Sequence, residues 1–274
     1  MTAGTPSVLE SIVAAARRRV EVARARRSLD VLEGALAGTA RHPARFLDAL
    51  QQPGLRVIAE CKRRSPSRGV LREAYDPTAI ASQYQRAGAA AVSVLTEPCF
   101  FDGHLDHLTA VHAACPALPL LRKDFTVDEY QIAEAALAGA SAVLLILAAL
   151  DQTTFVRLHR YADQVGVDVL AEVHDQAEAR RAVNGGARVV GVNNRNLETL
   201  EVAIETSYRL APLLASVPLR VAESGLRTGA DLAALHAAGY GAFLIGERFM
   251  TDADPGAALA ALLDDAAAAL ETRP

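Results

Sequence analysis

Short apolar runs alternate with helical stretches along most of the chain, and four of these runs repeat one pattern. A small residue and a glycine lead into β-branched or apolar residues in AGAAAVSVL from Ala87, AGASAVLLIL from Ala138, GGARVVGVN from Gly185 and AGYGAFLIG from Ala238. The glycine suits the left-handed position that follows a helix, because it has no Cβ to clash. The apolar run after it is typical of a strand that is buried on both faces.

These four units recur about every 50 residues, twice the length of one strand-helix unit, so another strand is expected in each interval. Strand-like runs do occur there and before the first unit: VIAEC from Val57, LPLLRKDF from Leu118, VDVLAEVHD from Val167 and PLRVAES from Pro218. Eight alternating strands and helices predict an α/β protein with a closed (β/α)8 barrel, the TIM-barrel fold. A doubly wound open sheet is the alternative.

Residues 1–54 precede the first predicted strand. Two stretches within them have a helical pattern, LESIVAAARRRVEVA and ARFLDALQQ, and we expect both to pack on the barrel as helices. In the first stretch the arginines are expected to face water, and the buried stripe to consist of Leu9, Ile12, Val13, Ala16 and Val20. Residues 1–274 are therefore expected to form a single barrel domain, with 1–54 as its N-terminal helical extension.

Composition and charge argue against some classes of binding partner and of cellular compartment. The 274 residues are 51% hydrophobic with a net charge of -4, so a sizeable core can form and no overall field favours nucleic acid or an anionic membrane. Three cysteines without CxxC spacing argue against a disulfide framework or a zinc site. No apolar stretch is long enough to span a bilayer and no signal-peptide core is evident, so we expect a cytoplasmic protein.

Polar or charged residues end nearly every predicted strand. The carboxyl ends of barrel strands meet at one rim, where active groups lie. The residues at these ends are Glu60 and Lys62, Thr96 and Glu97, Lys123 and Asp124, Glu172, Asn193 to Arg195, Glu223 to Gly225, and Gly246 and Glu247. Glu60, Lys62, Lys123 and Glu172 interrupt or directly follow apolar runs, where a charge is costly unless it is paired. Together they predict a ring of acids and bases suited to proton transfer without a metal.

Other polar groups have plainer interpretations. Glu97, Asp124 and Arg63 fit helix caps and surface ion pairs at least as well as function. Cys61 alternates away from the charged groups on its strand, so a thiol in the barrel wall is favoured over a nucleophile. A metal site is disfavoured because the candidate ligands match no compact zinc spacing: His104, His107, His112, Asp102 and Asp106.

An anion site is predicted where the last two strands end. Ser224-Gly225 and Gly246-Glu247 place small residues whose backbone N–H groups can approach a ligand, at the strands that commonly hold phosphate in such barrels. Two such ends on adjacent strands favour a phosphate more than one glycine loop would. Ser65, in the first loop, can add a hydroxyl group.

Seven stretches of the chain resemble the indole-3-glycerol phosphate synthase family: VIAECKRRSPSRG, SVLTEPCFFDGHLDHL, LLRKDFTVDEYQIAEAALAGASAVLLI, LAEVHD, VVGVNNRNLETLEV, VAESGL and LIGERFM. They span about Val57 to Met250 in the family's order. The resemblance implies a carboxy-lyase of tryptophan biosynthesis that converts 1-(2-carboxyphenylamino)-1-deoxyribulose 5-phosphate to indole-3-glycerol phosphate with loss of CO2 and water. It implies no cofactor and a small phosphorylated substrate as partner, and it raises contact with other enzymes of the pathway as a further expectation.

The resemblance also implies roles for single residues. Lys123 in LRKDF is the acid that protonates the alkoxide formed on ring closure, and Glu172 is its electrostatic partner and proton carrier. Glu60 and Lys62 act as the later pair, in the dehydration. The groups that orient the substrate are Asn193 and Arg195, with Phe125 near the anthranilate ring.

The phosphate and ribulose side of the substrate matches residues after the first and the last two strands. They are Ser65, Glu223, Ser224, Gly225, Gly246 and Glu247. Gly246 and Glu247 are expected to act through their backbone N–H groups. A carboxylate beside a phosphate would repel it, so the Glu247 side chain is expected to point away, toward the start of the final helix. Ser65-Pro66 is expected to begin a loop that covers the substrate.

Departures from the family's usual residues at Cys61, Ala171 and the RFM ending change shape rather than chemistry. Two other functions stay open. An isomerase acting on phosphoribosylanthranilate would use a cysteine and an aspartate, but Cys61 and Asp124 lie in the wrong motifs. A non-catalytic barrel in a tryptophan-pathway assembly is disfavoured, because it has no need of unpaired charges inside its rim.

Overall fold

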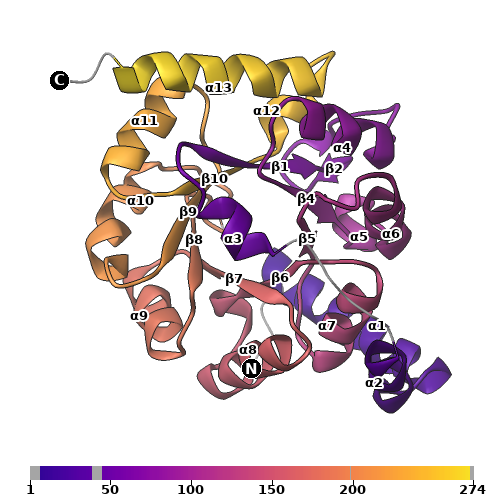
Figure 1. Cartoon of the computed structure of the whole chain (residues 1–274). Helices are drawn as coiled ribbons and strands as arrows, with labels where there is room; N and C mark the ends of the chain where they lie inside the picture. The colour runs from indigo at the N-terminus through magenta and orange to yellow at the C-terminus, as the bar shows by residue number, and fades with distance from the viewer. Residues whose placement is uncertain (1–6, 39–44, 198, 272–274) are drawn as a thin grey trace.

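A computed structural model describes residues 7–38, 45–197 and 199–271. Within these ranges eight parallel strands close into a barrel surrounded by helices, which confirms the predicted fold (Figure 1). Neighbouring strands follow the chain order, and the first strand closes the ring against the last. The barrel strands are β1 (Arg56–Cys61), β4 (Ala91–Leu95), β5 (Leu120–Lys123), β6 (Ala142–Ile146), β7 (Asp168–Val173), β8 (Val189–Asn193), β9 (Leu219–Glu223) and β10 (Ala242–Ile245).

Helices of the repeating units cover the outside of the barrel. They are α4 (Pro77–Arg86), α6 (Leu105–Ala114), α7 (Glu129–Leu137), α8 (Gln152–Gln164), α9 (Gln176–Asn184), α10 (Glu205–Leu210), α11 (Gly229–Ala237) and α13 (Pro255–Glu271). Shorter elements lie in the connections: the hairpin β2 (Arg64–Ser65) and β3 (Gly69–Val70), α5 (Pro98–Phe101), α12 (Glu247–Met250), and the 3-10 turns η1 (Leu147–Ala149) and η2 (Ala211–Leu214).

The repeated glycine pattern has the predicted backbone geometry. Gly88, Gly139, Gly186 and Gly239 follow α4, α7, α9 and α11 with φ of 89, 92, 81 and 96°. These values lie in the left-handed region, which glycine adopts without steric cost. Each glycine therefore lets the chain leave a helix and enter the next strand of the barrel wall.

Side chains inside the barrel change from apolar at the amino-terminal end to charged at the carboxyl-terminal end. Successive residues of a strand point to opposite faces, so inward positions lie two apart. On β1, the buried Ile58 is followed inward by Glu60, and on β7 Leu170 is followed by Glu172. The apolar inward layer forms a core of its own, distinct from the larger core between strands and outer helices.

The predicted N-terminal helices close both ends of the barrel. Helix α3 (Phe46–Leu50) lies over the middle of the ring of strands, and its Phe46, Leu47 and Leu50 pack into the apolar inward core (Figure 1). The Leu47 N–H donates to Asp168 Oδ2 at 3.1 Å, at the first residue of β7. Arg188 also donates to that aspartate, at 3.0 Å. Helix α3 thus seals the amino-terminal end.

Helix α1 (Val8–Arg26) lies at the opposite end, where Val8, Leu9 and Ile12 line the pocket at the barrel mouth. Its buried residues are Ile12, Ala16 and Val20, as predicted, while Leu9 and Val13 are half-buried. The expectation that its arginines all face water is wrong for Arg19. This side chain spans two carboxylates on barrel loops, Glu97 at 2.8 Å and Asp124 at 3.0 Å, because both are buried there and need a cation.

Helix α2 (Leu29–Ala37) packs against α7 on the outside of the barrel. Residues 1–6 and 39–44 of the expected N-terminal extension lie outside the described residues. Among the helices of the described ranges, none has the length and apolar character needed to cross a membrane.

Candidate active site

The polar strand ends meet in one pocket at the barrel mouth, as the rim argument predicted. Every predicted site residue except Gly225 and Gly246 lines it, and these two line an adjoining pocket. The residues that share the first pocket are Glu60, Lys62, Ser65, Lys123, Phe125, Glu172, Asn193, Arg195, Glu223, Ser224 and Glu247. Six barrel strands or the turns that follow them therefore supply these side chains to one space.

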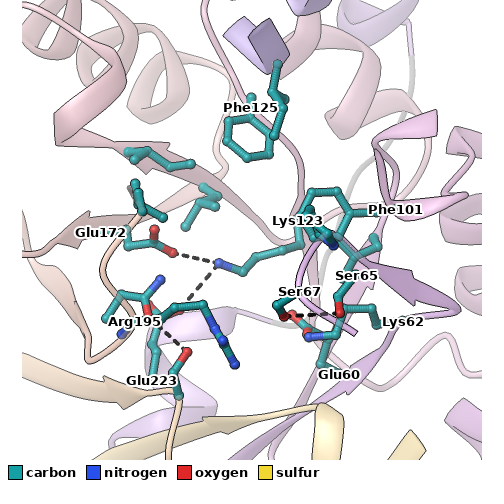
Figure 2. A pocket seen from close by; sticks show the side chains of 18 of the residues that line it. Glu60, Lys62, Ser65, Ser67, Phe101, Lys123, Phe125, Glu172, Arg195 and Glu223 are labelled. Atoms are coloured by element: carbon teal, nitrogen blue, oxygen red, sulfur yellow. Dashed lines mark hydrogen bonds and ion pairs between the residues drawn. The ribbon is translucent and has the colours of Figure 1, made fainter. Parts of the chain in front are cut away.

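Lys123, at the end of β5, occupies the centre of this pocket. Its ammonium Nζ lies 2.7 Å from Glu172 Oε2 and 3.3 Å from Glu223 Oε2, so carboxylates from β7 and β9 share one cation (Figure 2). All three side chains are largely buried, where ionic contacts are stronger than in water. One Glu223 oxygen, Oε1, is buried without a hydrogen-bond partner among the described residues. We term Lys123, Glu172 and Glu223 the lysine cluster.

Burial and neighbouring charges shift the pKa values of the three groups of the lysine cluster in different directions. Burial alone would lower the pKa of Lys123, but Glu172, Glu223 and Glu60 outweigh it and raise that pKa above its ordinary value. Burial likewise opposes ionisation of Glu172, yet Lys123 and His174 hold its pKa below the usual range. Burial, together with the nearby Glu172 carboxylate, raises the pKa of Glu223 to about 8. The cluster thus holds a protonated amine, an ionised carboxylate and a carboxyl group able to exchange a proton near neutral pH.

Two glycines make room for the carboxylates. A Cβ at Gly191 on β8 would lie 2.0 Å from Glu223 Oε1, and a Cβ at Gly246 would lie 2.5 Å from Glu60 Oε1. Any side chain at either position would therefore push a carboxylate out of its present place. From the sequence, Gly246 was expected to act through its backbone N–H alone, and Gly191 was not among the predicted site residues.

Glu60 and Lys62 form a second ion pair, at the end of β1. Lys62 Nζ lies 2.7 Å from Glu60 Oε1 (Figure 2). Ser93 Oγ on β4 lies 3.3 Å from Glu60 Oε2. The two residues lie two apart and point the same way, as the alternation of a strand predicted. This pair faces the lysine cluster across the pocket.

The predicted phosphate side is formed by the ends of β8, β9 and β10. Ser224 and Gly225 both have left-handed backbone conformations, with φ of 65 and 80°. Asn194 fixes this turn, because its Nδ2 donates to the Ser224 carbonyl at 3.0 Å. Asn193 Oδ1 accepts from Ser224 Oγ at 2.9 Å and from the Arg195 N–H at 3.0 Å.

An apolar wall completes the pocket. Phe101 and Phe125 approach each other with ring centroids 6.2 Å apart, and Phe125 lies above Lys123 in Figure 2. Leucines from β6, β10 and the β8 loop, and residues of α1, line the same space: Leu144, Leu197, Leu200, Leu244, Val8, Leu9 and Ile12. The pocket therefore offers one apolar side, one acid and base side and one polar, backbone-rich end.

Comparison with known proteins gives this arrangement a family. A sequence model of indole-3-glycerol phosphate synthase matches residues 9–262. The indole-3-glycerol phosphate synthase of Mycobacterium sp. (strain KMS) is 48% identical over 257 residues, covering 94% of both chains. That of Sulfurimonas denitrificans is 43% identical over 255 residues, covering 92% of this chain and 97% of the relative. The chain belongs to the indole-3-glycerol phosphate synthase family.

Solved structures of other families share the fold. A crystal structure of mandelate oxidase superposes with a TM-score of 0.60, covering 79% of this chain and 74% of that chain at 18% identity. At that identity the likeness concerns the barrel alone, since one barrel architecture hosts many unrelated chemistries.

The Glu247 side chain departs from what the family resemblance led us to expect. Its carboxylate does not turn away from the phosphate side but lies in the pocket, 3.0 Å from Arg68 Nε and 3.3 Å from an Arg195 guanidinium nitrogen. Two guanidinium groups attract it there, and this attraction exceeds that of the single-turn helix α12. We term Arg68, Arg195 and Glu247 the arginine rim.

The segment expected to begin a covering loop, Ser65-Pro66, lies in the short β2–β3 hairpin. Arg63 pairs with Asp102 at 2.5 Å, which ties the hairpin to the turn after α5. Ser65 is buried and its Oγ lies 3.5 Å from Ser67 Oγ, facing the pocket (Figure 2). The hairpin thus covers one side of the mouth.

Glu97 is a helix cap, as predicted, whereas Asp124 forms buried ion pairs instead of surface ones and lines the pocket. Glu97 caps α5, accepting from the Cys99 and Phe100 N–H groups, and Asp124 accepts from Thr96 and Arg122. Cys61 is buried in the barrel wall, where burial raises its thiol pKa well above the ordinary value. In the described ranges no three His, Cys, Asp or Glu side chains are arranged to hold a metal ion.

Among the polar and aromatic residues that line or support the pocket, those not singled out from the sequence include Ser67, Arg68, Phe101 and His174. Ser67 and Arg68 lie in the hairpin, where no periodic pattern fixes a side-chain direction. His174 carried a usable signal, since it follows Glu172 by two residues and so points to the same side. A second unused signal is composition, because the chain has two lysines, Lys62 and Lys123, among 28 basic residues.

Proposed function

We propose that this chain converts 1-(2-carboxyphenylamino)-1-deoxyribulose 5-phosphate to indole-3-glycerol phosphate, CO2 and water. Membership of the indole-3-glycerol phosphate synthase family supports the reaction. The observation that supports the residue roles is the Lys123 ammonium, held between Glu172 and Glu223 in a pocket with one apolar side. Both lysines of the chain face this pocket, and lysine, unlike arginine, can give up its proton.

Ring closure is the first step. The aromatic carbon that bears the carboxylate attacks the C2 ketone, a carbon-carbon bond forms, and the carbonyl electron pair moves to oxygen. Lys123 donates its Nζ proton to that oxygen, so that a hydroxyl forms and a neutral amine remains. Glu172 stabilises the ammonium before the transfer and can return a proton to the amine after it.

Loss of CO2 follows from the structure of the ring-closed intermediate. The bond between the ring carbon and its carboxylate breaks, and its electron pair restores the conjugation of the ring. An apolar surround favours this step, because a carboxylate is poorly solvated there and CO2 is neutral. Phe101, Phe125 and the leucine side of the pocket provide such a surround, with Phe125 placed to stack on the anthranilate ring.

Dehydration needs an acid to protonate the departing C2 hydroxyl and a base to take a neighbouring proton. The Glu60–Lys62 ion pair supplies one of each within 2.7 Å and faces the same pocket. We assign this step to the pair. Glu223, whose pKa burial raises to about 8, is suited to carry a proton between the steps.

The phosphate is expected at the adjoining pocket, where β9 and β10 end. Backbone N–H groups of Ser224, Gly225, Gly246 and Glu247 can approach it there, and Ser65 can donate its hydroxyl. Asn193 and Arg195 would orient the ribulose chain between phosphate and ring. A phosphate arriving at the arginine rim would compete with the Glu247 carboxylate for the guanidinium groups, which replaces the ion pair by a stronger, doubly charged partner.

We further propose that residues 1–274 act as one barrel domain in the cytoplasm, in contact with other enzymes of tryptophan biosynthesis. The cysteine pattern supports a reducing compartment: Cys61 and Cys115 are buried thiols and Cys99 is exposed, and all three are free. A pull-down from cytoplasmic extract with the pathway's other enzymes as candidate partners tests the contact. Failure to retain any of them in the presence of substrate would remove that part of the proposal.

A fluorescence assay for indole-3-glycerol phosphate tests the reaction. Purified protein is mixed with the carboxyphenylamino-deoxyribulose phosphate, beside Lys123→Ala and beside His236→Gln on the exposed face of α11. Turnover is expected to fall by about 10³-fold or more in Lys123→Ala, within the range for loss of a general acid, and to stay unchanged in His236→Gln. Substrate binding without turnover in the unchanged protein would indicate a non-catalytic barrel.

A further inference from the structure

A histidine lies behind the Glu172 carboxylate, on the side away from Lys123. His174 Nε2 lies 3.3 Å from Glu172 Oε1, while Glu172 Oε2 contacts Lys123 at 2.7 Å. The two oxygens of one carboxylate therefore face two different nitrogen bases. Neither the proposed reaction nor the sequence analysis gives His174 a role.

The local sequence holds His174 in place. Asp175 caps α9 by accepting from the Glu178 N–H at 2.8 Å. The Glu178 carboxylate then reaches back, accepting from the His174 backbone N–H at 2.8 Å and lying 3.1 Å from His174 Nδ1. This is a variant of the capping box in which the returning carboxylate also contacts a side chain. One glutamate thereby fixes both the backbone and the ring of His174.

The contacts of the ring indicate its charge. Both ring nitrogens face carboxylate oxygens, and only an imidazolium has a proton on each nitrogen to offer them. Burial alone would lower the pKa of His174, but Glu172 on β7 and Glu178 on α9 outweigh it and raise that pKa to about 10. Arg181, a cation on α9, donates to the Leu147 and Leu150 carbonyls and not to Glu178.

These contacts form a chain from α9 to the reacting centre, and the charge alternates from Glu178 to Lys123. In order, its members are Glu178, His174, Glu172, Lys123 and Glu223. When Lys123 gives its proton to the substrate it becomes neutral, and Glu172 loses its principal counter-ion while still buried. An unpaired buried carboxylate is costly, so a lysine with no cation behind its partner would hold its proton more tightly.

We infer that His174 is a positioning residue: fixed as an imidazolium by Glu178, it neutralises Glu172 when Lys123 transfers its proton and so keeps Lys123 a competent acid. This inference rests on the proposed function. The bond that breaks is Lys123 Nζ–H, whose electron pair stays on nitrogen, and the bond that forms is O–H on the substrate. His174 itself transfers no proton. At present its Nε2 makes an ion pair with Glu172 that is not aligned as a hydrogen bond, and a small rotation of the freed carboxylate would align it.

The decisive experiment compares His174→Gln with His174→Arg, using the fluorescence assay at several pH values. The glutamine variant removes the charge, and its kcat is expected to fall at least about tenfold, because an opposite charge at this distance shifts a neighbouring pKa by about 1 to 3 units. The acidic limb of its pH–kcat profile is expected to move to higher pH, since Glu172 then accepts a proton more readily. The arginine variant keeps the charge and is expected to recover most of kcat.

A second variant covers the case in which His174→Gln does not fold. Glu178→Gln retains an oxygen to accept from the His174 N–H but removes the charge that holds the imidazolium. An alkaline fall in kcat is then expected at a pH lower than in the unchanged protein, as His174 loses its proton. The control is His236→Gln, an exposed histidine on α11.

The outcomes distinguish a failure of the His174 inference from a failure of the proposed function. Equal losses in His174→Gln and His174→Arg, with both limbs of the profile unmoved, would mean that His174 has only a packing role and would overturn the inference. Absence of turnover in the unchanged protein would instead overturn the proposed function. Selective 15N-labelling of lysine gives an independent view, since the chain has two lysines: the Lys123 side-chain signal is expected to shift in His174→Gln while the Lys62 signal stays.

Discussion

The two ends of the barrel are closed in opposite ways. At the amino-terminal end, α3 inserts Phe46, Leu47 and Leu50 into an apolar layer and leaves few polar groups to satisfy. At the carboxyl-terminal end, α1 covers a pocket whose floor holds the lysine cluster, in which one ammonium faces two buried carboxylates. The first end gains stability by burying apolar surface. The second places charges where water is scarce, which costs stability and gives reactivity.

This difference predicts where a substitution should affect folding and where it should affect turnover. In barrels of this kind, groups at the carboxyl ends of strands serve catalysis and groups at the other end serve stability. The Lys123→Ala assay proposed above tests the catalytic end. Three further substitutions test the separation of the two ends, from the largest expected effect to the smallest.

Leu50→Ala should affect stability and leave the chemistry intact. The side chain is buried in the apolar layer, so its removal is expected to lower the unfolding free energy by about 2 to 5 kcal/mol, the range for leucine cavities. Urea unfolding followed by circular dichroism measures this loss. At 25 °C the folded fraction should retain the unchanged protein's kcat. A large fall in kcat of the folded variant would show that the two ends are coupled.

Glu223→Gln should make the unfolding free energy of the protein less sensitive to a rise in pH. Burial and Glu172 raise the pKa of Glu223 from 4.5 to about 8, so the folded state binds this proton more tightly than the unfolded state. The resulting stability is fully present below pH 4.5 and is lost as pH rises through about 8. The glutamine variant lacks this loss, so its unfolding free energy should fall by about 4 kcal/mol less between pH 5 and pH 9.

Chemical denaturation at pH 5, 7 and 9 measures the effect of Glu223→Gln. The matched control is Glu21→Gln, since Glu21 is exposed on α1 and pairs with Arg18 at the surface. Parallel stability profiles for Glu223→Gln and the unchanged protein would contradict a proton held by Glu223.

Arg68→Ala should have the smallest effect on stability, because its ion pair with Glu247 is largely exposed and such pairs contribute about 0 to 1 kcal/mol. Its effect on substrate binding should be larger. If the arginine rim exchanges Glu247 for the phosphate, KM is expected to rise several-fold with kcat nearly unchanged, as when uniform binding is lost. Steady-state kinetics on Arg68→Ala and Arg64→Ala, a neighbouring arginine that lines neither pocket at the mouth, measure this. Equal KM values would place Arg68 outside the phosphate site.

Much of the fold could be predicted from sequence because the barrel is periodic. Every predicted strand forms, and the glycines after the helices have the expected left-handed φ, since both depend on local pattern and steric rules. The contact of Lys123 with Glu172 follows from strand ends meeting at one rim, and that of Lys62 with Glu60 follows from the alternation of one strand. In these cases the local sequence pattern and the overall fold predict the same position for each residue.

The features that the sequence did not predict depend on long-range partners. Arg19 was expected in water, but its two carboxylates lie 78 and 105 residues further along the chain. The Glu247 direction depends on an arginine from the hairpin, and no period fixes side chains there. His174 could have been noticed from its spacing to Glu172. Its charge, however, depends on Glu178 returning from the next helix, which only the capping geometry shows.

The contact of Arg19 with Asp124 also limits how early helix α1 can dock while the chain is being synthesised. Helix α1 leaves the ribosome early, but the second of its two carboxylate partners is synthesised 105 residues later. At about 5 to 20 residues per second this delay lasts about 5 to 20 seconds, long compared with the formation of a helix. During that time the apolar stripe of α1 has no barrel to cover. The mouth of the barrel can therefore close only after β5 has emerged from the ribosome, so α1 docks late although it is translated first.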